Sequence, residues 1–268
     1  MRLGGKRAVV TGAAQGIGNA IARRLVAEGA RVALVDLSPP TDVPDGDHLA
    51  LACDVADSAA VDHAFARISE HFGGIDVLVN NAAVGRGPDD GTPEMFAAVN
   101  ARDGQIARGE EPSIYPDQLI HMSDEGWAHV LGVNLNGTFY CCRAAVRLMA
   151  AEKVGGSIVN IASTCVQNAD GPLHYVVSKS AVLGLTRRLA LELAARGIRV
   201  NAVNPGPTRT PVMATIPAEV AERLRRTVPL GRMGEPEEVA AAVAFLAGDE
   251  ASYMTGSAVT VNGGSYLI

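Results

Sequence analysis

The sequence lacks an excess of positive charge: 23 Lys and Arg face 29 Asp and Glu, a formal net charge of −6. A nucleic-acid binder needs surplus cations to neutralise phosphates, so this composition argues against one. No stretch is long and apolar enough to span a membrane, and the N-terminal "MRLGGKRAVVTG" has too short an apolar run for a signal peptide. The four cysteines show no C-x-x-C spacing, so neither zinc nor a disulfide framework is indicated. We expect a soluble, reduced, cytoplasmic protein with no nucleic-acid or membrane partner.

Internal repeats, low-complexity tracts and a domain linker are also missing. At 268 residues, of which 48% are hydrophobic, the chain fits one large α/β domain better than two small ones. We therefore expect a single domain over residues 1–268.

What the chain does contain is a regular alternation of short apolar runs and longer helical patterns. The expected strands cover 7–12, 31–36, 48–54, 75–81, 156–163, 198–204 and 257–262. The expected helices cover 17–29, 58–72, 127–150, 174–195 and 235–247. Continuous apolar strands separated by helices predict a parallel sheet that is covered on both faces. We expect a doubly wound (Rossmann) α/β fold of about seven mostly parallel strands, which binds ligands beyond the carboxyl ends of the strands.

One stretch, from about 86 to 121, breaks this alternation because it is rich in charge, Gly and Pro. A loop of this length inside a compact domain is usually functional or flexible. Its root follows the fourth strand, so it leaves the sheet at the edge where an active site must open. We expect it to lie at the substrate entrance or on a neighbouring subunit; the alternative is an ornamental surface insertion.

The segment "TGAAQGIG" lies between the first strand and the first helix. Gly12, Gly16 and Gly18 would let the backbone approach a pyrophosphate at the positive end of that helix. The second strand ends in Asp36, about twenty residues further on, where a carboxylate can bind ribose hydroxyls. The glycine loop and an acidic residue at this distance from it together predict a dinucleotide cofactor.

Asp36 also favours NAD over NADP. A 2′-phosphate beside this carboxylate would make a like-charge contact costing several kcal/mol, and no Lys or Arg follows closely to compensate. Because about 1.4 kcal/mol corresponds to a tenfold change in affinity, this contact predicts a preference for NAD over NADP of roughly a hundredfold or more. Gln15 in the glycine loop, where a basic residue would suit NADP, agrees. Asp54, after the third strand, has two open roles: a hydrogen bond to the adenine amine, or a carboxylate at a helix N-terminus.

The run "LHYVVSKSAV" (173–182) places Tyr175 and Lys179 on one face of a helix. Taken alone, the spacing favours an ordinary amphipathic tyrosine beside a lysine that reaches the surface. The alternative is a phenol whose pKa is lowered by the ammonium toward the working pH of a general base. The neighbouring His174 is expected to serve the start of the helix rather than to act as a base.

Five motifs occur in order along the chain and favour the interpretation of Tyr175 as a general base. They are T-G-x-x-x-G-I-G at 11–18, "NNAA" at 80–83, the serine that ends "NIAS" at 163, Y-x-x-x-K at 175–179 and "NPG" at 204–206. Together they resemble the short-chain dehydrogenase/reductase family over nearly the whole chain, apart from 86–121.

The resemblance implies a catalytic tetrad of Asn134, Ser163, Tyr175 and Lys179. In this family's mechanism Tyr175 would exchange a proton with the substrate oxygen, and Ser163 would hold that oxygen. Lys179 would bind the nicotinamide ribose and lower the phenol pKa, while Asn134 would hold a water in a proton relay. A second candidate asparagine, Asn100 in "FAAVNARDG", is set aside because only Asn134 lies on the expected helix begun by Trp127, at a suitable distance before Ser163.

The resemblance also implies a cofactor-binding set, in which the backbone near Asn81 would contact the adenosine ribose and Thr208 would contribute mainly through its backbone. The set comprises Gly12, Gln15, Gly16, Ile17, Gly18, Asp36, Asp54, Val55, Asn81, Ala82, Tyr175, Lys179, Pro205, Gly206, Thr208 and Thr210. Thr210 is expected near the carboxamide or the pyrophosphate. Residues 211–226 would form a substrate lid, or simply another surface helix.

These features predict an oxidoreductase that moves a hydride between a secondary alcohol or ketone and NAD. The alternatives are a 3-oxoacyl thioester reductase and a dinucleotide-binding protein without catalysis, which an intact tetrad argues against. The resemblance further implies a homotetramer or homodimer built through the helices at 127–150 and 174–195. No metal is expected.

Overall fold

A seven-stranded sheet forms the centre of the protein, with the strand order β3-β2-β1-β4-β5-β6-β7 and parallel pairing throughout. The computed structural model describes residues 1–41, 44–152, 155–211, 213 and 218–267. The strands are β1 (Arg7–Thr11), β2 (Arg31–Asp36), β3 (Leu49–Ala52), β4 (Val77–Asn80), β5 (Gly156–Ile161), β6 (Ile198–Pro205) and β7 (Ala258–Val261). The predicted doubly wound fold is confirmed.

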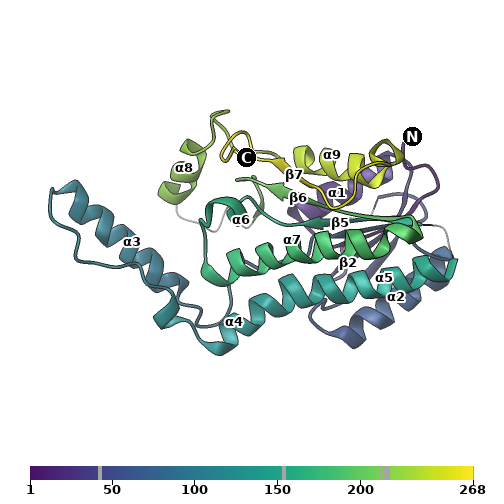
Figure 1. Ribbon diagram of the computed structural model, residues 1–268, viewed down its shortest axis with the longest axis horizontal. Helices are drawn as coiled ribbons and strands as arrows, with labels where there is room; N and C mark the ends of the chain where they lie inside the picture. The colour runs from purple at the N-terminus through teal and green to yellow at the C-terminus, as the bar shows by residue number, and fades with distance from the viewer. Residues whose placement is uncertain (42–43, 153–154, 212, 214–217, 268) are drawn as a thin grey trace.

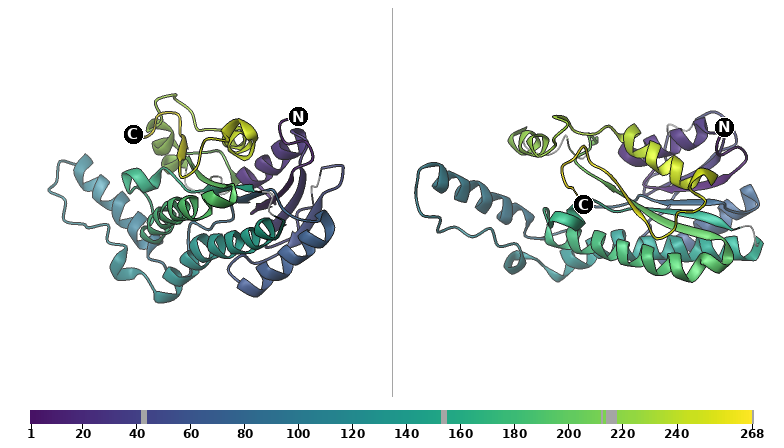
Figure 2. Two further views of the ribbon diagram at one scale, coloured as in Figure 1. Left: turned by 45° about the vertical axis from the view of Figure 1, so that its right-hand side comes forward. Right: turned by 45° about the horizontal axis from the view of Figure 1, so that its top comes forward.

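Helices cover both faces of this sheet (Figures 1 and 2). The helices are α1 (Gly16–Ala27), α2 (Ser58–Phe72), α3 (Thr92–Ala107), α4 (Asp124–Leu131), α5 (Thr138–Glu152), α6 (Cys165–Asn168), α7 (Leu173–Leu193), α8 (Ala218–Arg226) and α9 (Pro236–Ala247). One face is covered by α1 and α9, and the other by α2, α5 and α7. None of the described helices is long and apolar enough to cross a membrane.

The strands are apolar on both sides because both sides are buried. In β1, Ala8 and Val10 pack into the hydrophobic cluster under α1 and α9, whereas Val9 packs into the cluster under α2 and α5. Successive side chains of a strand point to opposite faces, so this alternation follows from the backbone alone. The strand order reverses between β1 and β4, and the crevice beyond their carboxyl ends is where such folds bind ligands.

The helix expected over 127–150 is interrupted. It begins three residues earlier, at Asp124, where the Ser123 side chain caps it by accepting a hydrogen bond from the Gly126 N–H. A π-helical turn, Gly132–Gly137, then separates α4 from α5. Such turns are rare and often found at functional sites, and this one contains Asn134.

The stretch expected to be a loop contains the 16-residue helix α3, so that expectation was wrong. Pro93 in the first turn and Glu94 after it are helix-start signals, and they outweigh the helix-weakening Gly104. We call residues 90–118 the arm. Its return segment runs along α3, where Arg102 donates a hydrogen bond to the carbonyl of Ile114 at 2.9 Å.

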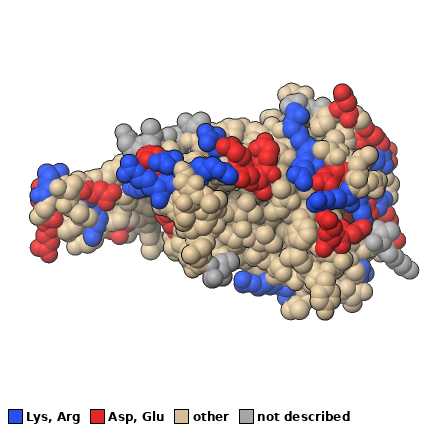
Figure 3. All heavy atoms as spheres, turned by 90° about the horizontal axis from the view of Figure 1, so that it is seen from above, with Lys and Arg blue, Asp and Glu red and all other residues tan. Residues whose placement is uncertain are grey.

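The arm extends away from the sheet at the end of the molecule that carries α4 and α8 (Figures 1 and 2). The chain enters and leaves the arm side by side, because Asp90 forms an isolated antiparallel bridge with Met122, four residues beyond the end of the arm. On α3, Asp103 pairs with Arg223 of α8 at 3.5 Å between exposed side chains. Acidic and basic side chains are interspersed on the face of the arm seen in Figure 3, so that face is not a patch of one sign.

Candidate active site

The glycine loop after β1 is shaped by close backbone contacts. Gly12 has φ of 65°, and a Cβ there would lie 2.8 Å from the Cα of Ala82. A Cβ on Gly18 would overlap the carbonyl oxygen of Gly12. Side chains at these positions would therefore break the contact between the loop, α1 and the end of β4. The result is a side-chain-free cradle at the N-terminus of α1, which suits a pyrophosphate.

Asn81, just beyond β4, ties that strand to the glycine loop. Its side-chain amide donates to the carbonyls of Thr11 and Gly12, each at 3.0 Å. In return, the Thr11 hydroxyl accepts from the backbone N–H groups of Asn81 and Ala82 at 3.0 and 3.1 Å. The side chain of Asn81 is thus used within the protein.

Asp36 ends β2 beside the same loop. Its carboxylate accepts hydrogen bonds from the backbone N–H of Ala14 at 2.9 Å and of Leu37 at 2.7 Å. The side chain is half-buried, which leaves part of the carboxylate open at the carboxyl edge of the sheet. A ribose bound against the loop would meet this negative charge.

The two roles left open for Asp54 can now be compared. The N-cap of α2 is Asp57, which accepts hydrogen bonds from the N–H groups of Ala59 and Ala60. Asp54 is exposed, and within the part of the chain that the structure describes its carboxylate accepts a single, local hydrogen bond, from the Ala56 N–H at 2.9 Å. Capping is therefore not its role. The adjacent Val55 is buried, and a Cβ on Gly137 would lie 2.8 Å from its Cγ2.

Tyr175 and Lys179 lie in the first two turns of α7, as their spacing predicts. The Lys179 Nζ lies 5.8 Å from the centroid of the Tyr175 ring and donates a hydrogen bond to the carbonyl of Ile161 at 2.8 Å. Burial lowers the pKa of Lys179 to about 8. The lysine is thus held beneath the phenol at the end of β5.

Burial raises the pKa of Tyr175 to about 12, the nearby Cys165 adds to this, and the hydrogen bond with Ser163 acts in the opposite direction. The expected lowering of the phenol pKa by the lysine is therefore not found in the protein alone. The cost of desolvating a phenolate outweighs the hydrogen bond with Ser163.

Asn134 is completely buried, and its side chain is used within the protein. Its amide nitrogen donates to the Val84 carbonyl and to the Ser178 hydroxyl, each at 3.0 Å, and its oxygen accepts from the Val84 N–H at 2.8 Å. Ser178 in turn donates to the Tyr175 carbonyl at 2.8 Å, which links Asn134 to α7. The rival Asn100 is exposed on α3.

The loop after β6 approaches the glycine loop. Gly206 has no room for a side chain, since a Cβ would lie 2.6 Å from the Cβ of Asn262. The Thr208 hydroxyl donates a hydrogen bond to the Gly206 carbonyl at 2.9 Å, so its proton is engaged within the loop. Thr210 faces Gly16, where a Cβ would lie 3.5 Å from the threonine Cβ. Of the expected lid, residues 212 and 214–217 lie outside the described residues, and 218–226 form α8.

The motifs that were separate in the sequence thus meet at one edge of the sheet, and the same arrangement recurs in known proteins. The family description "short chain dehydrogenase" matches residues 6–103, and "Enoyl-(Acyl carrier protein) reductase" matches residues 106–266. The chain belongs to the short-chain dehydrogenase family. It is accordingly an oxidoreductase of CH–OH groups that uses a nicotinamide dinucleotide. The break between the two matches falls within α3 of the arm.

Curated relatives of this short-chain dehydrogenase match all or nearly all of its length. The (3R)-3-hydroxyacyl-CoA dehydrogenase of Mus musculus is 36% identical over 283 residues, covering 100% of this chain and 98% of the relative. The D-threitol dehydrogenase of Mycolicibacterium smegmatis is 36% identical over 277 residues, covering 98% of this chain and 94% of the relative. Among solved structures, the ligand-free aldohexose dehydrogenase of Thermoplasma acidophilum aligns with a TM-score of 0.79 at 33% identity, covering 98% and 94%.

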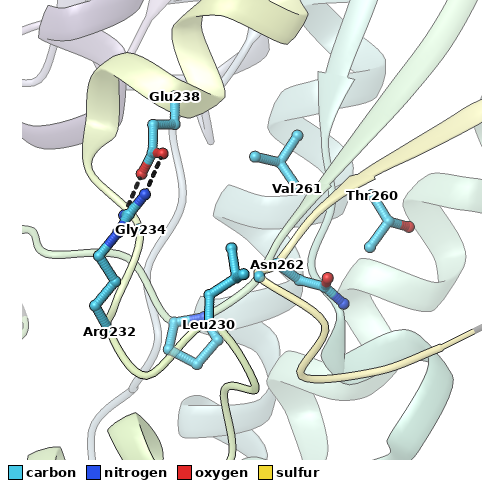
Figure 4. Close-up of a pocket in the computed structure, with 9 residues that line it drawn as sticks. Leu230, Arg232, Gly234, Glu238, Thr260, Val261 and Asn262 are labelled. Carbon is cyan, nitrogen blue, oxygen red and sulfur yellow. Dashed lines mark hydrogen bonds and ion pairs between the residues drawn. The ribbon is translucent and has the colours of Figure 1, made fainter.

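A separate cavity of about 270 Å³ lies against the last strand of the sheet (Figure 4). Its lining residues are Pro207, Leu230, Arg232, Gly234, Glu238, Thr260, Val261, Asn262 and Gly263. None of them belongs to the tetrad or to the glycine loop. Arg232 is already paired with Glu238 through two hydrogen bonds of 2.7 Å, so its charge is neutralised within the dehydrogenase.

Sequence reasoning missed two buried residues of the arm, Asp90 and Gln118, that contact the start of α7. They lie 84 residues from His174 and 55 residues from Leu173, respectively, and no local pattern marks such pairs. Only the fold brings them to the first turn of α7, which carries Tyr175.

Proposed function

We propose that this short-chain dehydrogenase uses NAD to oxidise a secondary alcohol, with Tyr175 as general base and Asn134, Ser163 and Lys179 completing the tetrad. One observation carries the proposal. The phenol of Tyr175 lies beside both Ser163 and the Lys179 ammonium, at the same sheet edge as the glycine loop and Asp36.

The residues at this edge of the sheet fit a dinucleotide. The cradle formed by Gly12, Gly16 and Gly18 would receive the pyrophosphate, with Thr210 on its far side. Asp36 would accept the adenosine ribose hydroxyls and disfavour a 2′-phosphate by like-charge repulsion. Gln15, Ile17, Asp54, Val55, Ala82, Pro205, Gly206 and Thr208, together with the backbone near Asn81, complete the proposed contacts.

The chemistry requires a proton acceptor near the substrate oxygen. The bound nicotinamide would supply the hydride acceptor. Ser163 would hold the substrate hydroxyl, and Tyr175 would take its proton. In the protein alone, the pKa of about 12 keeps the phenol protonated, so the site must gain positive charge before Tyr175 can act as a base. Lys179, held by the Ile161 carbonyl, is placed to share that task and to bind the nicotinamide ribose.

The substrate is a secondary alcohol or the corresponding ketone, and the relatives suggest two classes. One is a polyol or sugar, as the names of the D-threitol and aldohexose dehydrogenases state for those proteins. The other is a 3-hydroxyacyl thioester, as the name of the mouse relative states. Asp36 favours NAD-linked oxidation over NADPH-linked 3-oxoacyl reduction, which remains the second candidate.

A substrate panel tests this proposal. Purified protein is mixed with NAD or NADP and with cyclic, aromatic and aliphatic secondary alcohols, polyols and 3-hydroxyacyl-CoA, and NAD(P)H formation is followed by absorbance. We expect NADH formation with at least one alcohol class and a preference for NAD. A clear preference for NADP would overturn the cofactor assignment, and dinucleotide binding without turnover of any alcohol would favour a non-catalytic protein.

The proposal includes a homotetramer or homodimer in the cytoplasm. Apolar side chains are exposed on the two helices expected to pair, namely Phe139 on α5 and Val177 and Leu191 on α7. The four cysteines are free and buried, which suits a reducing compartment.

A further inference from the structure

The helix that carries Tyr175 has no N-terminal cap of its own. Its N-cap residue is Pro172, which makes no side-chain hydrogen bond to the helix. The first N–H groups of a helix have no partner within the helix and need one elsewhere. Two of them are satisfied by side chains: the Leu173 N–H donates to Gln118 Oε1 at 2.7 Å, and the Tyr175 N–H donates to His174 Nδ1 at 2.8 Å.

His174 is in turn held by the arm. Its Nε2 lies 2.9 Å from Asp90 Oδ2, and both residues are almost completely buried. Because Nδ1 accepts the Tyr175 N–H, the neutral ring carries its proton on Nε2 and donates it to the carboxylate. The ring orientation is therefore fixed from both sides, by Tyr175 and by Asp90.

Asp90 is itself rigidly placed. Its carboxylate also accepts hydrogen bonds from the N–H groups of Gly87 at 2.8 Å and Thr92 at 2.9 Å. Burial would raise the pKa of Asp90, but the hydrogen bonds from Gly87, Thr92 and His174 outweigh it and hold the pKa below its usual value. A charged acceptor therefore faces His174 at neutral pH.

Gln118 closes the network at the other end of the arm. Its Nε2 donates to the Asp90 carbonyl at 2.9 Å and to the Thr92 hydroxyl at 3.1 Å, and the residue is buried. We call Asp90, Thr92 and Gln118 the arm root. The two ends of the arm are thus joined to each other and to the first turn of α7.

We propose that the arm root is a positioning device, in which Asp90 acting through His174 and Gln118 acting directly fix the first turn of α7 and hence the phenol of Tyr175. The inference rests on the proposed function, because it assumes that Tyr175 transfers the proton. Misplacement of a reacting group by about 1 Å can cost roughly 100-fold in rate, so a buried hydrogen-bond network is an effective way to hold it.

This role divides the arm into two parts. Replacement of the whole stretch 86–121 would remove the caps of α7 and damage the Tyr175 chemistry. Replacement of the distal part alone, residues 94–116, by a short Gly/Ser linker keeps Asp90, Thr92 and Gln118. The second change should leave turnover within about threefold of wild type, whatever it does to the ranking of substrates.

The test compares Asp90→Ala with Asp90→Asn, whose amide oxygen can still accept the His174 proton. We expect Asp90→Ala to lower kcat by tenfold or more, with the Kd for NADH, from fluorescence titration, within twofold of wild type. Asp90→Asn should recover most of the lost turnover. The solvent deuterium isotope effect on kcat should increase in Asp90→Ala, because a misplaced phenol slows the proton step, whereas a smaller folded fraction would leave that effect unchanged.

His174→Asn is a second variant, in case Asp90→Ala does not fold. The Asn oxygen can take the place of Nδ1 and keep the Tyr175 cap, but it cannot reach Asp90, so an intermediate loss of kcat is expected. Wild-type kcat in folded Asp90→Ala or His174→Asn, or an equal loss in the distal replacement, would overturn the proposal. Tyr175→Phe separates failure of the proposed function from failure of the positioning role. If Tyr175→Phe retains full turnover, the proposed function itself fails. If Tyr175→Phe is inactive while Asp90→Ala has normal turnover, only the positioning role fails.

Discussion

The Lys179 Nζ donates its hydrogen bond to the backbone carbonyl of Ile161, at 2.8 Å. Both groups are buried, and the partner is a neutral carbonyl rather than a carboxylate. The ammonium is therefore held in position without being neutralised, and burial lowers its pKa to about 8. A cation kept at this cost does not add stability, which agrees with the role toward the cofactor and the phenol that we propose for it.

Lys179→Met should therefore change the pH dependence of stability. The folded pKa lies below the ordinary value of 10.5, so the protonated lysine destabilises the folded protein below about pH 8. This penalty fades as pH rises from about 8 to about 10.5. We expect the stability of Lys179→Met relative to wild type to fall by up to about 3 kcal/mol over this range, as measured by denaturant unfolding without cofactor. A difference that does not vary with pH would contradict the buried ammonium.

Alcohol oxidation should increase with pH, and ketone reduction should not. A raised pKa keeps Tyr175 protonated below about pH 12, which suits the reduction, whereas oxidation needs the phenolate. We expect the kcat of oxidation to rise with a midpoint well below 12 in wild type, because the positive charges of the complex favour the phenolate. In Lys179→Met the midpoint should move upward. Equal midpoints in the two proteins would show that Lys179 does not act on the phenol.

Asp36→Ala should change the choice between cofactors, and Asp54→Ala should not. The carboxylate of Asp36 lies against the glycine loop through the Ala14 N–H, whereas Asp54 is exposed with one local hydrogen bond. We expect Asp36→Ala to weaken NAD binding and to relax discrimination against NADP by about tenfold or more. The ratio of kcat/KM for the two cofactors measures this discrimination. Asp54→Ala should affect NAD and NADP equally. A preserved NAD preference in Asp36→Ala would place the selectivity elsewhere.

Gly18→Ala should abolish cofactor binding or the folding of the glycine loop, because its Cβ would overlap the Gly12 carbonyl oxygen. The matched control is Gly104→Ala in α3, whose Cβ would lie 3.3 Å from the flexible end of the Arg108 side chain. Removing a helix-interior glycine there should stabilise the protein by roughly 0.5–1 kcal/mol. Isothermal titration with NADH and thermal unfolding measure the two effects. Normal NADH affinity in Gly18→Ala would rule out the close approach.

The fold could be predicted from the sequence because its signals are local. Each strand is a continuous apolar run, and each run is followed by a helical pattern or a turn, so all seven strands were located to within a few residues. The helix α3 was missed because Gly104 and the charged, Pro-rich flanks resemble a loop. The π-helical turn around Asn134 could not be predicted, since a six-residue turn of this kind has no distinctive composition.

The places of the glycine loop and of the Tyr175–Lys179 pair in the fold could be predicted, because each belongs to one local motif. Two features depend on the fold instead. In the protein alone the pKa of Tyr175 is raised by burial, which the sequence does not reveal, and its lowering in the cofactor complex stays a prediction. The contact between Asp90 and His174 joins residues 84 positions apart through a buried side-chain network.

The central claim, that Tyr175 transfers the proton, is tested most directly by Tyr175→Phe, measured for NADH affinity and for turnover on the best alcohol of the panel. The phenylalanine ring preserves the packing on α7 and removes only the hydroxyl beside Ser163. We predict a Kd for NADH within about twofold of wild type and a kcat lowered by roughly 10²–10⁴-fold, the usual cost of losing a positioned acid–base group. Near-normal turnover in the folded variant would contradict the account.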